Sequence, residues 1–105
     1  MVGQYEIYWV NLDPTLGSEI NKTRPAVVIS PNVSNKHLNT VLVAPLTSTI
    51  RNFPMRVDIV LGGKKGQVAL DQIRCVDKTR VLNPAGKLTA KEVKILRETL
   101  KEYLF

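Results

Sequence analysis

Hydrophobic residues along this chain fall in short runs of the kind that forms β-strands. Six segments are either continuously apolar or alternate between apolar and polar positions, and glycine, proline and asparagine separate them. The segments predicted as strands are residues 4–12, 25–30, 40–47, 55–61, 67–70 and 79–82. The sequences GGKKG and NPAGK predict turns after the fourth and sixth segments. Six short strands at this spacing predict a small, mainly β barrel.

The hydrophobic period changes near the C-terminus. Thr89 is followed three residues later by Glu92, which is the pattern of a helix-capping box. Beyond it, apolar residues recur at helical spacing on one face, at Val93, Leu96, Leu100 and Tyr103 or Leu104. We therefore expect an amphipathic C-terminal helix packed on the barrel.

Length and composition favour a single domain spanning residues 1–105. The chain is 44% hydrophobic and 23% charged, which is an ordinary globular mixture, and it contains no internal repeat or linker. A domain this small buries only about two-thirds of its unfolded surface. A homodimer is therefore expected, because association would bury more apolar surface.

Charge adds a partner class to this picture. Fifteen basic and nine acidic residues give a net charge of +6, which suits a polyanion such as nucleic acid, although a basic surface also occurs for solubility alone. One cysteine and one histidine offer no metal-ligand spacing, so neither a metal nor a cofactor is expected. No apolar run is long enough for a membrane span and no signal peptide is evident, which makes the cytoplasm the expected location.

The loop LGSEINKTRPAVVIS places Arg24 at the entry to a buried strand. Pro25 disfavours helical geometry at Arg24 and keeps it extended, so its planar fork of donors can face two phosphate oxygens. Lys22 can add a second positive charge. The alternative is a surface ion pair between Arg24 and Glu19, worth less than about 1 kcal/mol.

A second polar cluster follows the third predicted strand, in the sequence PLTSTIR. Pro45 cannot donate to a sheet ladder, which puts this segment at an edge or a bulge. The hydroxyls of Thr47, Ser48 and Thr49 with Arg51 form a candidate phosphate or oxyanion site. The alternative is a turn in which the hydroxyls bond their own backbone.

Other side chains have weaker indications. His37 has no acidic partner nearby in sequence and is interpreted as a surface residue. Trp9 alternates with Ile7 on the first strand and is predicted to lie in the core rather than to stack on a base. Phe53 is the better stacking candidate. Gln72 and Arg74 are expected to line either a groove or a dimer seam.

Four segments together resemble the MazF/PemK family of toxin endoribonucleases from bacterial toxin–antitoxin pairs. They are WVNLDPTLGSEINKTRPAVVIS, VLVAPLTS, FPMRVDI and VALDQIRCVDKTRV, in that order, and the match covers essentially the whole chain. Met55 and Cys75 depart from the residues usual at their positions. The resemblance implies an SH3-like (PemK/CcdB-like) barrel of five to seven strands with a C-terminal helix. It also implies a homodimer that cuts single-stranded RNA without a metal.

By motif position the resemblance implies that Arg24 and Thr47 are catalytic, and that Glu19 serves activity or substrate binding. The family's partner is a small MazE-like antitoxin with an acidic tail that occupies the RNA groove, which the basic charge here suits. RNA-binding residues are then expected at Lys22, Ser48, Thr49, Arg51, Phe53, Gln72 and Arg74.

Metal-free cleavage is chemically possible because the 2′-hydroxyl of RNA can attack the adjacent phosphorus. We assign charge stabilisation to Arg24, positioning of the phosphate to Thr47 and proton acceptance to Glu19. The proton donor stays open, because arginine does not readily give up a proton. Two alternatives also stay open at this point: a toxin of the same fold that poisons DNA gyrase, and a barrel that binds RNA without cutting it.

Overall fold

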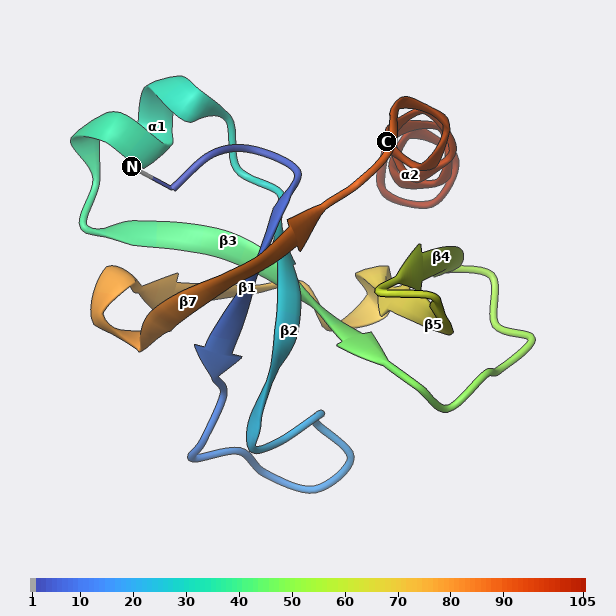
Figure 1. Ribbon diagram of the computed structural model, residues 1–105, viewed down its shortest axis with the longest axis horizontal. Coiled ribbons are helices and arrows are strands. Elements are labelled where there is room, and N and C mark those ends of the chain that lie inside the picture. Colours follow the sequence, from blue (N-terminus) through green and yellow to red (C-terminus); the bar gives the residue numbers. More distant parts are fainter. Residues whose placement is uncertain (1) are drawn as a thin grey trace.

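The computed structural model describes residues 2–105 as a curled antiparallel sheet with one long helix beside it (Figure 1). Within those residues there are seven strands, two α-helices and two short 3₁₀ helices. The strands are β1 Glu6–Asn11, β2 Thr23–Val28, β3 Thr40–Thr47, β4 Arg56–Leu61, β5 Lys64–Ala69, β6 Arg74–Asp77 and β7 Val81–Lys87. The helices are α1 Asn32–His37 and α2 Ala90–Leu104, and the 3₁₀ helices are Leu70–Gln72 and Lys78–Arg80.

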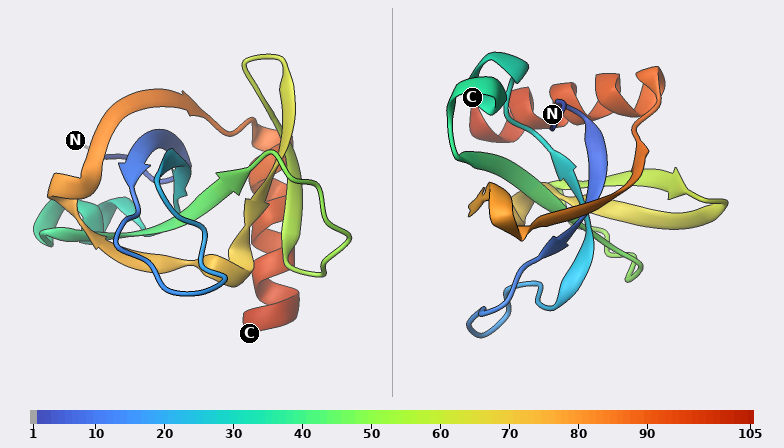
Figure 2. Two further views of the ribbon diagram at one scale, coloured as in Figure 1. Left: turned by 90° about the horizontal axis from the view of Figure 1, so that it is seen from below. Right: turned by 60° about the vertical axis from the view of Figure 1, so that its left-hand side comes forward.

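Strand β3 is the centre of the sheet, whose order is β4-β5-β3-β2-β1-β7 with β6 also paired to β3. One edge of β3 pairs with β2 through residues 43–45. Its other edge pairs first with β6, through residues 40–43, and then with β5, through residues 46 and 47. The hairpin of β4 and β5 consequently projects from the rest of the sheet (Figure 2). The expected small mainly β barrel is confirmed, in the form of a curled half-barrel.

Two apolar clusters hold the sheet together. The first gathers side chains from β1 to β5 with Leu96 of α2, and the second gathers side chains from β1, β2, β3 and β6. Strands β1, β2 and β3 contribute to both clusters, so burial on both sides of these strands explains their continuous apolar runs. The site described below lies where β2 and β3 separate, next to the β4–β5 hairpin.

The capping box predicted at the start of α2 is present. The Glu92 amide donates to the Thr89 hydroxyl at 3.2 Å, and the Thr89 amide donates to the Glu92 carboxylate at 2.9 Å. Leu96 is fully buried, and Val93 and Leu100 pack on the same cluster, which confirms the predicted apolar face. Within residues 2–105, neither helix is long and apolar enough to cross a membrane.

The predicted segment 40–47 matches β3, and the predicted segments 4–12, 25–30, 55–61 and 79–82 are confirmed as strands with shifted ends. The predicted segment 67–70 corresponds to β5, which begins earlier, at Lys64, because Gly62 and Gly63 alone form the turn between β4 and β5. Both have positive φ, +57° and +78°, and Leu61 pairs directly with Lys64. This is the two-residue hairpin that glycines favour.

One sequence prediction about the connections was wrong, and two elements were not predicted. Strand β6 and helix α1 are each too short to give a clear hydrophobic period. The NPAGK segment, predicted as a turn, belongs to β7. Its proline and glycine are tolerated because β7 is an edge strand with irregular pairing to β1, where Pro84 faces Tyr8.

The prediction that Trp9 lies in the core was also wrong. The prediction that His37 lies at the surface is confirmed. Trp9 is 42% exposed, while Ile7 and Val10 on the same strand are buried. Ile7 belongs to the first apolar cluster and Val10 to the second, so β1 keeps its alternation and is buried on both sides. Trp9 belongs to neither cluster and borders a hollow of the surface.

Candidate functional site

The site forms where the ladder between β2 and β3 stops. Its last pair joins Ala26 to Pro45, and the preceding residue of β2 is Pro25. Neither proline has an amide hydrogen to donate. Continuing the register by two residues would set Arg24 opposite Thr47, but that pair does not form, and Thr47 pairs with Gln67 of β5 on the other edge of β3. The two strands thus separate between the residues that the sequence singled out.

Arg24 and Thr47 line one hollow of about 420 Å³, together with Trp9, Ser48 and the start of β5. The alternative ion pair between Arg24 and Glu19 is not formed. Instead, the Arg24 Nε donates to the Asn21 carbonyl at 2.8 Å. This bond fixes the plane of the guanidinium, and within residues 2–105 its two terminal nitrogens have no hydrogen-bond partner, so they can bind an anion.

The alternative considered for the segment after β3, a turn in which a hydroxyl bonds the backbone, is present and orients Thr47. The Thr49 amide donates to the Thr47 Oγ1 at 3.1 Å. Because the hydroxyl oxygen already accepts this bond, its own hydrogen can be donated elsewhere. Gly66 lies against this residue so closely that an added Cβ would stand 3.1 Å from the Thr47 carbonyl oxygen. The hydroxyl is thus held beside Arg24 as a donor.

A second hollow lies on the other side of Thr47. It is lined by Thr49, Arg51 and Phe53 from the loop after β3, with Ser18 and Ile20 from the loop between β1 and β2. Gln72 lines this second hollow and also a third one, beside Glu19 and Arg74. Shared residues thus connect three hollows into a continuous surface, in which Thr47 is common to the first two.

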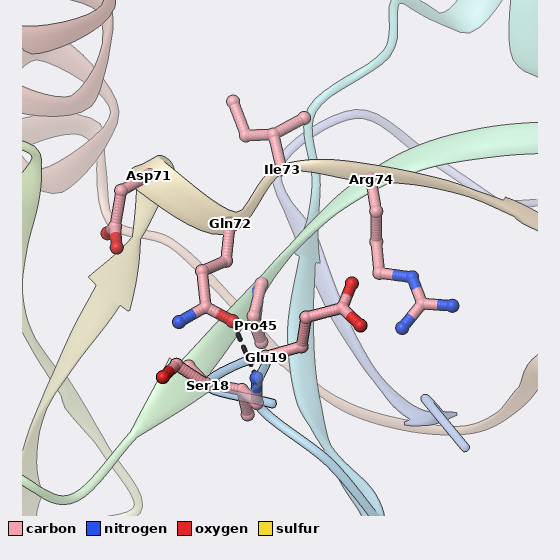
Figure 3. Close-up of a pocket in the computed structure, with 8 residues that line it drawn as sticks. Ser18, Glu19, Pro45, Asp71, Gln72, Ile73 and Arg74 are labelled. Atoms are coloured by element: carbon pink, nitrogen blue, oxygen red, sulfur yellow. Dashed lines mark hydrogen bonds between the residues drawn. The ribbon is translucent and has the colours of Figure 1, made fainter. Parts of the chain in front are cut away.

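Glu19 lies in the third hollow and not in the one shared by Arg24 and Thr47. Its carboxylate accepts a hydrogen bond from the Leu16 amide at 2.5 Å. Figure 3 shows the same carboxylate directed towards the guanidinium of Arg74, across the hollow from Gln72. The structure therefore brings Arg24 and Thr47 together and places Glu19 with Arg74.

Gln72 and Arg74 hold the loop that carries Glu19. The Gln72 side-chain oxygen accepts from the Ile20 amide at 2.6 Å, the bond drawn in Figure 3, and Arg74 donates to the Leu12 carbonyl at 2.9 Å. These bonds span more than fifty residues of sequence. Both side chains line the third hollow, and both also hold the chain segment between β1 and β2 that borders it.

Gln67 holds the loop after β3 in place in the same way, although the sequence did not point to this residue. Its buried amide accepts from the Arg51 amide and donates to the Arg51 carbonyl, both at 3.0 Å. The same amide nitrogen donates to Asp58 at 2.9 Å. A polar residue opening an otherwise apolar strand was the available signal. Gln67 thus fixes the backbone that presents Arg51.

Phe53 is held by a chain of contacts that begins at Asp71. The Arg56 guanidinium makes two bonds to the Asp71 carboxylate, at 2.8 and 3.2 Å, and lies 5.0 Å from the centroid of the Phe53 ring. Arg56 is neutralised by this pair. Phe53 remains 51% exposed, so its ring is fixed in place while part of it is open to a ligand.

The remaining expected residue, Lys22, is exposed in the loop between β1 and β2 and does not line these hollows. Its amide donates to Asp13 at 3.0 Å. Of the two unusual positions, Met55 packs on the first apolar cluster and Cys75 is exposed on β6. No three His, Cys, Asp or Glu side chains of residues 2–105 gather as metal ligands would.

Two ionisable groups with shifted pKa values lie outside the three hollows. Burial, aided by the hydrogen bond to Glu6, raises the pKa of the Tyr8 hydroxyl. Hydrogen bonds from the amide and then the hydroxyl of Thr79 lower the pKa of Asp77. Tyr8 lies on β1 and Asp77 on β6, and neither is part of the surface that holds Arg24.

A small half-barrel with free arginine donors, a hydroxyl donor and exposed rings along one surface has the features of a protein that binds single-stranded nucleic acid. Comparisons with known proteins narrow this class. The family model of the PemK-like, MazF-like toxin of type II toxin–antitoxin systems matches residues 3–104. The chain belongs to this family, as the sequence resemblance indicated.

Known relatives agree with this assignment. Endoribonuclease MazF9 of Mycobacterium tuberculosis is 36% identical, and the match covers 99% of this chain and 97% of that protein. The crystal structure of MazF from Deinococcus radiodurans superimposes with a TM-score of 0.85 at 27% identity, covering 98% of this chain and 96% of that one. An endoribonuclease from a mycobacterial species, solved with its cognate antitoxin, has the same fold, with a TM-score of 0.84 at 22% identity over 99% of this chain and 95% of that one.

Proposed function

We propose that this protein is a toxin endoribonuclease that cuts single-stranded messenger RNA in the cytoplasm, arrests growth and is neutralised by a cognate antitoxin. The proposal rests mainly on the observation that Arg24 and Thr47 line the same hollow, at the point where β2 and β3 separate. Membership of the toxin family and the 36% identity to an endoribonuclease support it. They favour a nuclease over a gyrase poison or an inactive RNA-binding barrel.

The nucleophile in this proposal is the substrate's own 2′-hydroxyl, which attacks the adjacent phosphorus. The terminal nitrogens of Arg24 bind the phosphoryl oxygens and stabilise the charge that grows on them in the transition state. Thr47 donates a hydrogen bond that positions the same phosphate. The 5′-oxygen leaves and takes a proton from water, which gives a free 5′-hydroxyl, and a 2′,3′-cyclic phosphate remains. Because a guanidinium supplies the positive charge, no metal ion or cofactor is needed for these steps.

Proton acceptance is assigned to Glu19, and this assignment sets a geometric condition. Glu19 lies in the third hollow, beside Arg74. The RNA must therefore extend from there to the hollow of Arg24 if both residues are to act on one phosphate. A carboxylate that does not reach the 2′-hydroxyl would bind substrate instead, through exocyclic amines of a base. The effect of Glu19→Gln on kcat, against its effect on KM, separates the two functions.

The other side chains bind the strand on either side of this phosphate. Ser48 borders the hollow of Arg24, while Thr49, Arg51 and Phe53 line the next one. Gln72 and Arg74 complete the third hollow, and Lys22 supplies a charge from the exposed loop. Arginines and hydroxyls fix the backbone and the ring of Phe53 stacks on a base.

Replacing Arg24 by alanine is expected to lower the rate of cleavage about 100- to 1000-fold, as for loss of a donor to a developing oxyanion. The free energy of unfolding should change by less than about 1.5 kcal/mol, the contribution of one hydrogen bond. Thr47→Val should also cut poorly, and Thr47→Ser should retain activity because it keeps the hydroxyl. Cleavage of a long RNA and urea denaturation measure both quantities.

Arg97 provides the matched control, since it is an exposed arginine of α2 outside the three hollows. Arg97→Ala should cut at the parental rate. Folded Arg24→Ala protein with parental activity would contradict the assignment, and so would equal losses in Arg97→Ala and Arg24→Ala.

A single 2′-deoxynucleotide immediately 5′ of the cleaved bond should abolish cutting at that bond while leaving binding nearly unchanged, because charge and stacking survive the substitution. Products of the unmodified RNA should carry a 2′,3′-cyclic or 3′-phosphate and a free 5′-hydroxyl, in equal yield with excess EDTA. Mass spectrometry of the ends tests this. Cutting of the deoxy bond, 5′-phosphate ends or inhibition by EDTA would require another nucleophile or a metal.

We also expect a homodimer with a mass of about twice 11.7 kDa in light scattering. An acidic antitoxin tail should compete with RNA for the cationic groove, and the competition should weaken as salt rises because both ligands are polyanions. Competition is measured by fluorescence anisotropy of a labelled RNA. A monomer that cuts RNA would contradict the dimer, and simultaneous binding of tail and RNA would contradict a shared groove.

A further inference from the structure

The hollow of Arg24 and Thr47 extends well beyond these two residues. Its floor is apolar, formed by Leu46 and Ile59, both almost fully buried. One wall carries the indole of Trp9, and the opposite rim carries Lys64 and Lys65 at the start of β5. An aromatic wall, an apolar floor and a cationic rim are the features that bind one nucleotide, with its base against the ring and its phosphate at the lysines.

Packing alone does not explain why Trp9 is only partly buried. Burying a large side chain completely would contribute about 2–3 kcal/mol to folding, yet 42% of Trp9 stays exposed. The residue is directly opposite Pro25 in the ladder of β1 and β2, next to the pair of Arg24 with Val10. A rigid strand therefore presents the indole one residue away from the arginine that is assigned to the phosphate.

The position of Thr47 sets the path of a bound strand. Thr47 is common to the hollow of Trp9 and to the hollow of Phe53, so a phosphate held at Thr47 borders two hollows that each contain one exposed ring. An RNA chain continues in both directions from its scissile phosphate. The two hollows can accept its two flanking nucleotides.

We propose that Trp9 and the lysines of the β4–β5 hairpin form a nucleotide subsite on the side of the scissile phosphate opposite Phe53. The ligand is single-stranded RNA, one base of which stacks on the indole while Lys64 or Lys65 binds the adjoining phosphate. Gly62 of the hairpin turn also lines this hollow and adds no side chain that would narrow it. This inference rests on the proposed function, because it locates the flanking nucleotide relative to the cleaved bond.

The single tryptophan of the chain allows a direct test that needs no cleavage. Wild-type protein is titrated with a 12-nucleotide 2′-O-methyl RNA of random sequence, which stacks and carries charge but lacks the free 2′-hydroxyl. Binding is followed by anisotropy of a label on the RNA and, separately, by indole emission. We expect emission to be quenched at least twofold in step with binding. Full binding with unchanged emission would overturn the subsite.

Variants separate stacking from structure. Trp9→Ala should weaken binding about 5- to 150-fold, the range for loss of one stacked base, whereas Trp9→Phe should stay within about fivefold of wild type. In cleavage assays the loss should appear in KM, with kcat nearly unchanged, because Arg24 and Thr47 are intact. Lys65→Gln should reduce the slope of log affinity against log salt by about 1.

Tyr103→Ala is the matched control, an exposed aromatic on α2 outside this hollow, and should behave as wild type. Wild-type binding by Trp9→Ala would contradict the proposal, as would a fall in its mass in light scattering, which would make Trp9 an interface residue. Quenching by a 12-residue acidic peptide but not by RNA would assign the hollow to a protein partner instead. A protein that binds and quenches but cuts no RNA would refute the endoribonuclease proposal while leaving this subsite intact.

Discussion

The separation of β2 from β3 is the constraint on which the functional surface depends. Two strands that stay paired along their length would bring Arg24 and Thr47 into an ordinary ladder, with backbone bonds filling the space between them. Pro25 and Pro45, neither of which can donate, lie where the ladder ends. Strand β3 then pairs with β5 at Thr47. An opening thus forms between two rigid strands, lined with polar groups that the sheet does not use.

The walls of this opening are fixed by side chains that bind backbone rather than substrate. Gln67 clamps the backbone of Arg51, Gln72 holds Ile20, and Arg74 holds the end of β1 through Leu12. The pair of Arg56 with Asp71 supports the Phe53 ring. Catalysis by positioning and charge stabilisation requires this rigidity, because the groups must face the phosphate before it arrives. Much of the polar character of the chain thus serves to orient a few donors.

Sequence alone predicted the strands that carry long apolar runs, the capped C-terminal helix and the loops that hold Arg24 and Thr47. These features are local, since a few neighbouring residues determine them. The sequence could not predict Trp9 in the site, because Trp9 borders a hollow that forms only where β2 and β3 separate. Gln67 was missed for a related reason, since its partners Arg51 and Asp58 depend on which strand lies beside β5. The edge position of β7, which tolerates Pro84, is likewise set by topology.

The central claim is that one phosphate of a bound strand lies between the Arg24 guanidinium and the Thr47 hydroxyl. A crystal structure with an oligonucleotide that carries a 2′-deoxynucleotide at the cleaved bond tests this most directly. We expect a phosphate with oxygens within about 3.2 Å of an Arg24 terminal nitrogen and of Thr47 Oγ1. A strand whose backbone runs elsewhere on the protein, with Arg24 and Thr47 free of phosphate contacts, would contradict it.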